Sequence, residues 1–464
     1  MTEQNQNALN EECDAKMTRK YKGKIKDGNL QIGDYRGGDP EVTNLRFLEK
    51  FDIQTLTLFI SNDLSVKFKS STLKKLNVFN FREYYQEYQQ RLNLNVDDLE
   101  LENLEVLDLQ QNNLGNNQLN NLVKFKKLHT LDVSRNNVGL TIIHSVTSLT
   151  KLSMSKCKFK NIDLISSLVN LKELGLSFNR DFDRDFDLSP LYKLKSLTKL
   201  SMNDCELKNI DQIVQLTNLD VLEVSQNQLK TINQIYLLVN LKQLDISWHK
   251  QIDITPLKDL VGLIKLNISG CGLIQLNALK HLTNLQTLVL SSNPDIIITE
   301  LQYLKNHKFL NLLYCNLVSV YVLRPLVNLE ELDISGNEIL YLDSHLNEMK
   351  RLETLRVENN RISDFSSLEK HSNYNNIDDD DRRCFNISDQ KDPSQKQLRK
   401  AIKMNNIERP NIQLKEIPHK TLQTTFSNFK QEINAAISNA RQSQIQFTAN
   451  VVRLFQQLNQ FGFE

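Results

Sequence analysis

The chain contains 464 residues, and its 57 basic and 56 acidic side chains give a formal net charge of +1. This balance provides no long-range field for nucleic acid or for an anionic membrane, so neither is expected as a partner. A chain of this length would ordinarily form two or three domains, because a single compact core stops growing at about 250–300 residues.

Residues 1–44 are expected to form a lead-in and a cap. The first twenty residues are polar and lack the apolar core of a secretory signal. No later stretch reaches the roughly 18 consecutive apolar residues that a spanning helix needs. We therefore expect a soluble, cytoplasmic protein. Asp27-Gly28 lies between alternating apolar residues, which predicts a small hairpin that caps the first repeat of the chain.

A repeated pattern begins after this lead-in. Two degenerate copies are centred on Leu56 and Leu76. Residues 82–98 then interrupt the array with a Tyr- and Gln-rich insertion that we expect to be a helix or a loop. From residue 104 to residue 362 each copy reads L-x-x-L-x-L-x-x-(N/C)-x-L. The equivalent leucines Leu222, Leu244, Leu266, Leu288, Leu310 and Leu332 recur every 22 residues. A fixed period of this length indicates a solenoid.

The alternation within each copy predicts its local structure. Leu222 and Val224 alternate with polar neighbours, so each copy should begin with a short strand that turns one face inward. The rest of the copy is too short for a long helix, and we expect a 3₁₀ turn there. The predicted fold class is an α/β solenoid, with a concave parallel β-sheet, a convex side of 3₁₀ turns and loops, and a long C-terminal α-helix.

The ninth position of the pattern is Asn or Cys. An inward Asn such as Asn227 can satisfy backbone groups that the turn would otherwise bury unpaired. His249 takes this position once. Four cysteines that take it are separated by two or three repeats, so they would lie at least roughly 10 Å apart, beyond the reach of a disulfide. We expect these to be buried free thiols in a reducing compartment: Cys157, Cys205, Cys271 and Cys315.

This pattern resembles that of leucine-rich-repeat proteins of the 22-residue type. Leu216-Thr-Asn-Leu219 and Leu238-Val-Asn-Leu241 are similar to repeats of the internalins and of the type-1 protein phosphatase regulatory repeat protein. The resemblance covers residues 45–368. It implies an arc-shaped binding protein and, in the phosphatase-regulatory family, a concave column of acidic and aromatic residues that grips the catalytic subunit.

The composition changes after Leu368. Residues 369–416 are expected to be a solvated linker. In residues 417–464 apolar side chains recur in steps of three and four from Leu422 to Phe461, which predicts a long amphipathic helix with a coiled-coil-like seam. This helix could pack on the repeats, associate with a second copy, or bind a partner.

The columns of side chains along the predicted concave face are the candidate site. They carry mixed charges and suit a protein surface better than a phosphate backbone. Large aromatic residues stand two positions after the second strand apolar, where they could anchor a partner or pack on neighbouring repeats. A merely solvated face is the alternative. The candidate residues are Asp108, Asp132, Phe178, Lys199, Glu223, Asp245, Trp248, Lys265, Tyr314 and Asp333.

Signatures of catalysis are missing from the sequence. It contains no phosphate-binding Gly-rich loop, no GxSxG and no HExxH. The acidic segment that starts at Asp181 departs from a calcium loop, with Phe186 in place of Gly and Tyr192 in place of Glu. We expect no metal, no cofactor and no enzymatic activity. The predicted function is a protein-binding scaffold, with a phosphatase regulatory subunit or a scaffold that oligomerises through the C-terminal helix as alternatives.

Overall fold

The computed structural model describes residues 15–16, 18–20, 24–32, 45–60, 66–80, 94–157, 162–180, 187–342, 344–362 and 385–386. The chain divides into two compact units, Met1–His249 (unit 1) and Lys250–Glu464 (unit 2). The sequence does not predict this division, because the 22-residue pattern continues through it.

Short parallel strands form the sheet of unit 1. They lie in the order of the sequence, each paired with the next in parallel. The strands are β1 (Asn29–Ile32), β2 (Thr55–Ile60), β4 (Lys75–Asn80), β6 (Val106–Asp108), β7 (Thr130–Asp132), β8 (Lys151–Ser153), β9 (Glu173–Gly175), β10 (Lys199–Ser201), β11 (Val221–Glu223) and β12 (Gln243–Asp245). Two further strands, β3 (Phe68–Ser70) and β5 (Leu99–Leu101), pair with each other in a separate parallel sheet.

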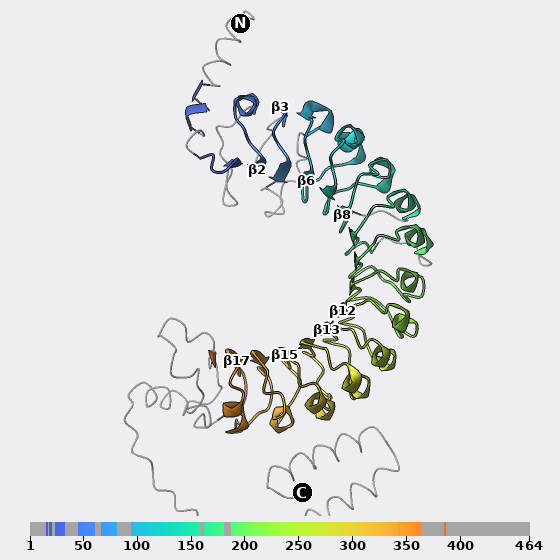
Figure 1. The fold of residues 1–464 in the computed structure, drawn as a ribbon, viewed down its shortest axis with the longest axis vertical. Coiled ribbons are helices and arrows are strands. Elements are labelled where there is room, and N and C mark those ends of the chain that lie inside the picture. The colour runs from blue at the N-terminus through green and yellow to red at the C-terminus, as the bar shows by residue number, and fades with distance from the viewer. Residues whose placement is uncertain are drawn as a thin grey trace, which may run out of the picture. The chain divides into compact units, whose positions relative to one another are not determined.

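The connections of unit 1 run through 3₁₀ turns, as the sequence predicts. Figure 1 shows these turns on the outer side of the unit, with the sheet on the inner side of its curve. The turns are η1 (Arg46–Lys50), η3 (Val96–Asp98), η4 (Asn116–Leu119), η5 (Leu122–Lys124), η6 (Leu140–Ile142), η7 (Asp163–Ser167), η8 (Ser189–Lys193), η9 (Ile213–Gln215) and η10 (Ile235–Leu237).

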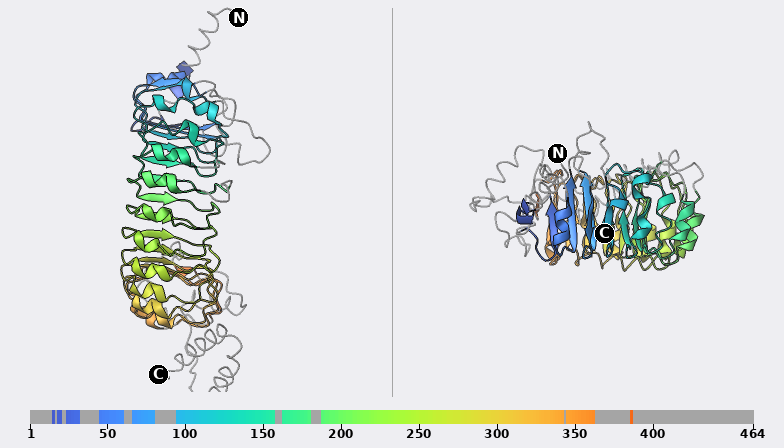
Figure 2. Two further views of the ribbon diagram at one scale, coloured as in Figure 1. Left: turned by 90° about the vertical axis from the view of Figure 1, so that its right-hand side faces the viewer. Right: turned by 90° about the horizontal axis from the view of Figure 1, so that it is seen from above.

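Unit 2 repeats the same plan. Its strands β13 (Lys265–Asn267), β14 (Thr287–Val289), β15 (Phe309–Asn311), β16 (Glu331–Asp333) and β17 (Thr354–Arg356) pair in parallel. The 3₁₀ turns of unit 2 are η11 (Thr255–Asp259), η12 (Asn277–His281), η13 (Thr299–Tyr303), η14 (Tyr321–Leu323) and η15 (Ser344–Glu348). Figure 2 shows the turns of successive repeats stacked along one side of each unit.

The predicted core is confirmed. Leu222 and Val224 are fully buried, and the leucines at equivalent positions of the other repeats are buried with them. Burying one such side chain contributes about 1.5–3 kcal/mol. The inward side chains of each strand pack on the turns of their own unit, so the core of the described residues lies on that side of the sheet, and residues of the opposite face such as Glu223 are partly exposed.

Both ends of the array show features that differ from the predictions. Asp27 and Gly28 form a turn with positive φ, as expected, but β1 then pairs in parallel with β2 and adds a strand to the sheet. Within the predicted linker, β18 (Phe385–Asn386) pairs with β17. An unpaired strand edge leaves exposed N–H and C=O groups, and β18 satisfies part of the β17 edge.

Several predicted features lie outside the described residues. These are most of the insertion at 82–98, residues 181–186 of the acidic segment, the linker apart from residues 385–386, and the helix at 417–464. No helix in the described part of the chain is long and apolar enough to span a membrane.

Candidate functional site

The predicted columns of side chains exist within each unit. In unit 1, Asp108 lies opposite Asp132, and Glu223 lies opposite Asp245 on adjacent parallel strands. In unit 2, Asn311 lies opposite Asp333. Registered strands place equivalent residues about 4.8 Å apart, so each column presents a nearly continuous row of side chains on the sheet face.

The aspartates of these columns hold the end of their own strand. Asp132 Oδ1 accepts a hydrogen bond from the Ser134 backbone N–H at 2.8 Å. Asp245 Oδ1 accepts from both the backbone N–H and the hydroxyl of Ser247, at 2.9 and 2.6 Å. This two-residue Asx turn satisfies a backbone donor where the strand gives way to the loop.

Asp108 and Asp333 make the same turn. The Gln110 and Ser335 backbone N–H groups donate to them at 3.1 and 3.0 Å. Burial raises the pKa of the Asp108 carboxyl, and the charge of the neighbouring Asp132 raises it further, while the Gln110 hydrogen bonds oppose both effects. The aspartates of the acidic column therefore have a structural role that sequence reasoning missed. Its visible signal is an Asp two residues before a loop Ser, as in three of the four cases, whereas Asp108 precedes Gln110.

Two of the candidate charges neutralise each other. Lys199 Nζ lies 3.1 Å from Glu223 Oε1, across the β10–β11 pair. Lys151 and Glu173, which lie directly opposite each other on β8 and β9, make another pair at 2.7 Å. All four side chains are more than 30 % exposed, so each pair contributes no more than about 1 kcal/mol. Lys265, on β13 of unit 2, is exposed.

The three candidate aromatic residues occupy one position of the repeat. Phe178, Trp248 and Tyr314 are 50 %, 53 % and 54 % exposed. Their backbones are left-handed, with φ of 63°, 59° and 56°. Other repeats place residues such as Gln226 and Gly336 in the same conformation, so this turn, rather than the aromatic ring, requires the positive φ. A bulky residue there costs about 1–2 kcal/mol.

Tyr314 packs on its neighbour in the next repeat. A Cβ atom added to Gly336 would lie 2.2 Å from Tyr314 Cδ1, so the ring covers the glycine and no larger residue fits beneath it. Gly336 also has a φ of 64°. One face of the ring is thus fixed by unit 2 while the rest of the side chain stays exposed. Tyr314 therefore packs on the neighbouring repeat and is also exposed to solvent.

Unit 2 carries an apolar patch on its sheet face. Val289 and Phe309 lie diagonally across the adjacent strands β14 and β15, and Leu313 and Tyr314 follow the end of β15. Val289, Phe309 and Leu313 are each partly exposed. We call these four residues the apolar patch. Only Tyr314 of these four residues is predicted as a site residue from the sequence, because the repeat pattern does not show which columns bring apolar residues together.

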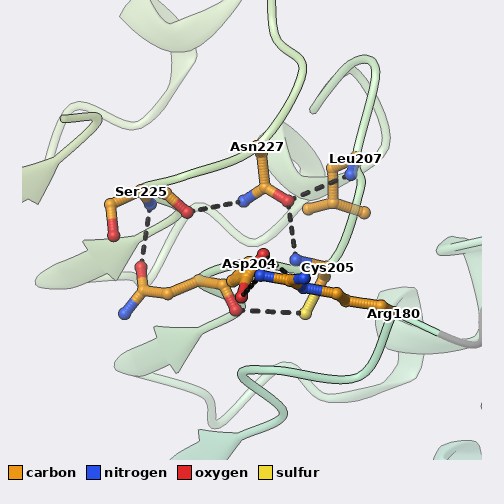
Figure 3. A network of polar contacts seen from close by, with 7 residues as sticks. Arg180, Asp204, Cys205, Leu207, Ser225 and Asn227 are labelled. Carbon is orange, nitrogen blue, oxygen red and sulfur yellow. Dashed lines mark hydrogen bonds and ion pairs between the residues drawn. The ribbon is translucent and has the colours of Figure 1, made fainter. Parts of the chain in front are cut away.

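The ninth position of the repeats forms a ladder of buried amides within each unit. Asn227 Nδ2 donates to the carbonyl groups of Met202 and Val224 at 2.9 and 2.7 Å. Its Oδ1 accepts from the Cys205 and Leu207 backbone N–H groups at 2.9 and 3.0 Å (Figure 3). The predicted role of the ninth position is confirmed. Asn227 joins its own turn to the preceding repeat.

Residues that replace the ladder Asn retain part of its bonding. The Cys205 thiol donates to the Leu176 carbonyl at 3.2 Å, and His249 Nδ1 lies 2.8 Å from the Ile246 carbonyl. Cys157, Cys205, Cys271 and Cys315 are buried and free, as predicted. Burial raises the pKa of Cys157 and Cys205 to about 12, so these thiols are held neutral.

An exposed arginine closes the network in Figure 3. The Arg180 guanidinium donates to both carboxylate oxygens of Asp204, at 2.8 and 2.6 Å. This bidentate pair links the turn before residues 181–186 to the following repeat. Within the described ranges, no group of three or more His, Cys, Asp or Glu side chains could hold a metal ion.

Comparison with known proteins agrees with this geometry. A model of leucine-rich repeats in two copies matches residues 327–370. An internalin from Listeria monocytogenes is 22 % identical, with a TM-score of 0.51 over 70 % of this chain and 86 % of its own. A leucine-rich-repeat protein from Leptospira interrogans is also 22 % identical, with a TM-score of 0.52 over 71 % of this chain and 92 % of its own. No curated protein matches the chain.

The fold is a leucine-rich-repeat fold.

Within this leucine-rich-repeat fold, the candidate residues have different roles. Four aspartates stabilise the ends of strands, and Lys199 and Glu223 form a partly exposed ion pair. Tyr314 lies in the apolar patch of unit 2. Phe178 and Trp248 are exposed at the equivalent turn of unit 1. The repeat geometry therefore offers an extended surface for contact and brings no catalytic constellation together among the described residues.

Proposed function

We propose that the chain is a non-enzymatic scaffold that binds another folded protein on the sheet face of its leucine-rich repeats. The apolar patch of unit 2 is the observation that carries this proposal. Interfaces concentrate exposed aromatic and aliphatic residues at their centre and charged residues at their rim. Here Lys265 and Glu331 lie on β13 and β16, the strands that flank β14 and β15, and Arg356 lies one strand further away, on β17.

Rigidity supports the same proposal. The Asn ladder and the packing of Tyr314 on Gly336 hold the patch in place before any partner arrives. Cys315, directly after Tyr314, donates its backbone N–H to Asn337 Oδ1 at 3.0 Å. A preorganised surface loses little conformational entropy on docking, which favours affinity.

Two exposed tyrosines of unit 2 provide a matched test. Tyr314 is on the sheet face and 54 % exposed, whereas Tyr303 is in η13 on the opposite side and 56 % exposed. Affinity purification with quantitative mass spectrometry should recover one set of partners with the wild-type chain and with Tyr303→Ala. The Tyr314→Ala variant should lose at least one of those partners by about tenfold, the size of a modest interface hot spot. Equal recovery by both variants would remove the patch from the binding surface.

The more specific alternatives remain predictions. Regulation of a type-1 phosphatase rests on the resemblance of the repeats, and the described acidic column contains no aromatic residue. Direct binding of purified type-1 catalytic subunit would test it.

Self-association through residues 417–464 is tested by light scattering of the full chain against a chain that ends near Pro418. Equal masses per chain would exclude it.

We further propose a cytoplasmic location. Four cysteines are buried and free in the ladder, where the spacing of the repeats keeps them apart. Such thiols are typical of reducing compartments. Fractionation of cells that express the tagged chain would test this, and recovery outside the cell would contradict it.

A further inference from the structure

A polar groove lies at the opposite end of the unit 2 strands from Tyr314. It has a volume of about 220 Å³ and is lined by Asn284, Gln286, Asn306, Lys308, Asn328 and Arg351. Gln286 directly precedes β14, and Lys308 directly precedes β15, so the groove runs along the amino ends of the strands. The groove shares no residue with the apolar patch.

A second row of amides forms the floor of this groove. Asn284, Asn306 and Asn328 each donate one amide hydrogen to a carbonyl of the preceding repeat, at 3.0, 2.8 and 3.0 Å. This bond fixes the orientation of each side chain. A carboxamide has two N–H donors, so each Asn keeps one N–H for a ligand.

Arg351 takes the place of Asn in the last copy of this row. Leu282-Thr-Asn284 and Leu326-Val-Asn328 correspond to Met349-Lys-Arg351. Within the described ranges the Arg351 guanidinium has no hydrogen bond and no ion pair, although it is exposed at the groove. The guanidinium therefore offers five donors in a rigid fork.

The charge of the groove is positive. Lys308 and Arg351 line it, and no acidic side chain does. Glu330 lies 2.9 Å from Lys308 Nζ and offsets one of the two charges. The charge of Arg351 is left without a counterion in the described part of unit 2, beside a row of fixed N–H donors.

We propose that this groove binds one oxyanion group, a carboxylate or a phosphate, carried by an acidic or phosphorylated side chain of a peptide. Carboxylates and phosphates accept paired N–H bonds from a guanidinium, and charge assistance makes these bonds stronger than neutral ones. The volume of about 220 Å³ has room for one side-chain head group such as a carboxylate or a phosphate. The groove shares no residue with the apolar patch and its test changes no patch residue, so this inference does not rest on the proposed function.

Saturation-transfer difference NMR with the full chain tests the proposal, because it detects weak binding. The probes are three pentapeptides of glycine and serine whose central residue is glutamate, phosphoserine or glutamine. We expect saturation of the glutamate and phosphoserine peptides and little of the glutamine peptide. Tighter binding of the phosphoserine peptide would assign the groove to phosphate, and the reverse order would assign it to carboxylate.

Variants locate the binding. Arg351→Gln should weaken it at least about fivefold, and Arg351→Lys, which keeps the charge but loses the fork, should lie between Arg351→Gln and wild type. Lys308→Gln should weaken it about twofold, because Glu330 already offsets that charge. Arg324→Gln is the control, since Arg324 pairs with Glu348 at 3.8 Å outside the groove and its loss should change nothing.

Two results would overturn the proposal. One is equal binding of the glutamine and glutamate peptides, because an oxyanion site must distinguish them. The other is wild-type binding by the Arg351→Gln chain. If far-UV circular dichroism shows that Arg351→Gln does not fold, the Lys308→Gln chain decides, and unchanged binding by that folded variant overturns the proposal. Loss of this site would leave the Tyr314 test of the proposed function unaffected.

Discussion

At the scale of single residues, side-chain hydrogen bonds to the backbone define the repeat. Asn227 serves two turns at once, with donors to Met202 and Val224 and an acceptor for Cys205 and Leu207. The aspartates at the strand ends, such as Asp245, serve one turn each. Residues that look like a binding column in the sequence are thus partly committed to the fold.

A pair of asparagines tests the difference between a buried and an exposed amide. Asn227→Ala removes donors and acceptors from several buried backbone groups, and we expect a loss of about 2–4 kcal/mol in the free energy of unfolding. Asn218→Ala removes one exposed bond to the Lys195 carbonyl, of 2.8 Å, and should cost less than about 1 kcal/mol. Urea denaturation followed by circular dichroism measures both. Similar losses would contradict the ladder's role.

The role of the residues at the ninth position could be predicted from the sequence, whereas the roles of the candidate site residues could be predicted only in part. Buried Asn and Cys follow from the pattern, since a turn leaves backbone groups that need partners. The Asx turn of Asp245 could be predicted from local spacing alone. The same aspartate can also be interpreted as a binding residue, and the sequence does not decide between the two roles. The apolar patch depends on the register of β14 and β15, which places Val289 opposite Asn311 and therefore diagonal to Phe309, and single positions do not show that arrangement.

At the scale of elements, the strands and 3₁₀ turns agree with the predictions, because the period-two alternation and the short remainder of each repeat leave few alternatives. The second amide row, of Asn284, Asn306 and Asn328, was not predicted from the sequence. Its Asn lies between two leucines of the loop that returns to the strand, as in Leu282-Thr-Asn284-Leu285. β18 was not predicted either, because the polar composition around Phe385 is typical of a linker.

One element of unit 2 contains a buried histidine where other repeats have leucine. His307 follows η13, at the position of Leu285 and Leu329, and its Nδ1 lies 2.9 Å from the Leu304 carbonyl. Burial lowers the pKa of His307 to about 4, and the Leu304 hydrogen bond only partly opposes this effect. The neutral ring therefore fits the core, whereas the protonated ring does not.

This histidine predicts acid sensitivity. Between pH 6.5 and about pH 4 the unfolded chain binds a proton at His307 that the folded chain does not, so stability falls as the pH is lowered through this window. The loss from this group could reach about 3 kcal/mol. His307→Leu should remove that part of the pH dependence without destabilising the chain at pH 7. Denaturation at pH 7 and pH 4.5 measures it, and an unchanged slope in the variant would contradict the assignment.

At the scale of the whole molecule, the 22-residue period predicts the leucine-rich-repeat fold and its exposed sheet. It does not predict the division into two units at His249, because each repeat contacts only its neighbours and the pattern carries no mark of a boundary. The 22-residue period does not identify the partner either. A repeated scaffold specifies where a surface is, and the few departures from the repeat specify what it contacts.

Hydroxyl-radical footprinting of the full chain, alone and with a partner recovered by affinity purification, tests the central claim most directly. It reports the solvent exposure of individual aromatic side chains. Tyr314 and Phe309 should become protected in the complex, while Tyr303 and Tyr321, which are exposed on the turns of unit 2, should oxidise at the same rate as before. Protection of Tyr303 and Tyr321 with unchanged oxidation of Tyr314 and Phe309 would place the partner on the turns and contradict the account.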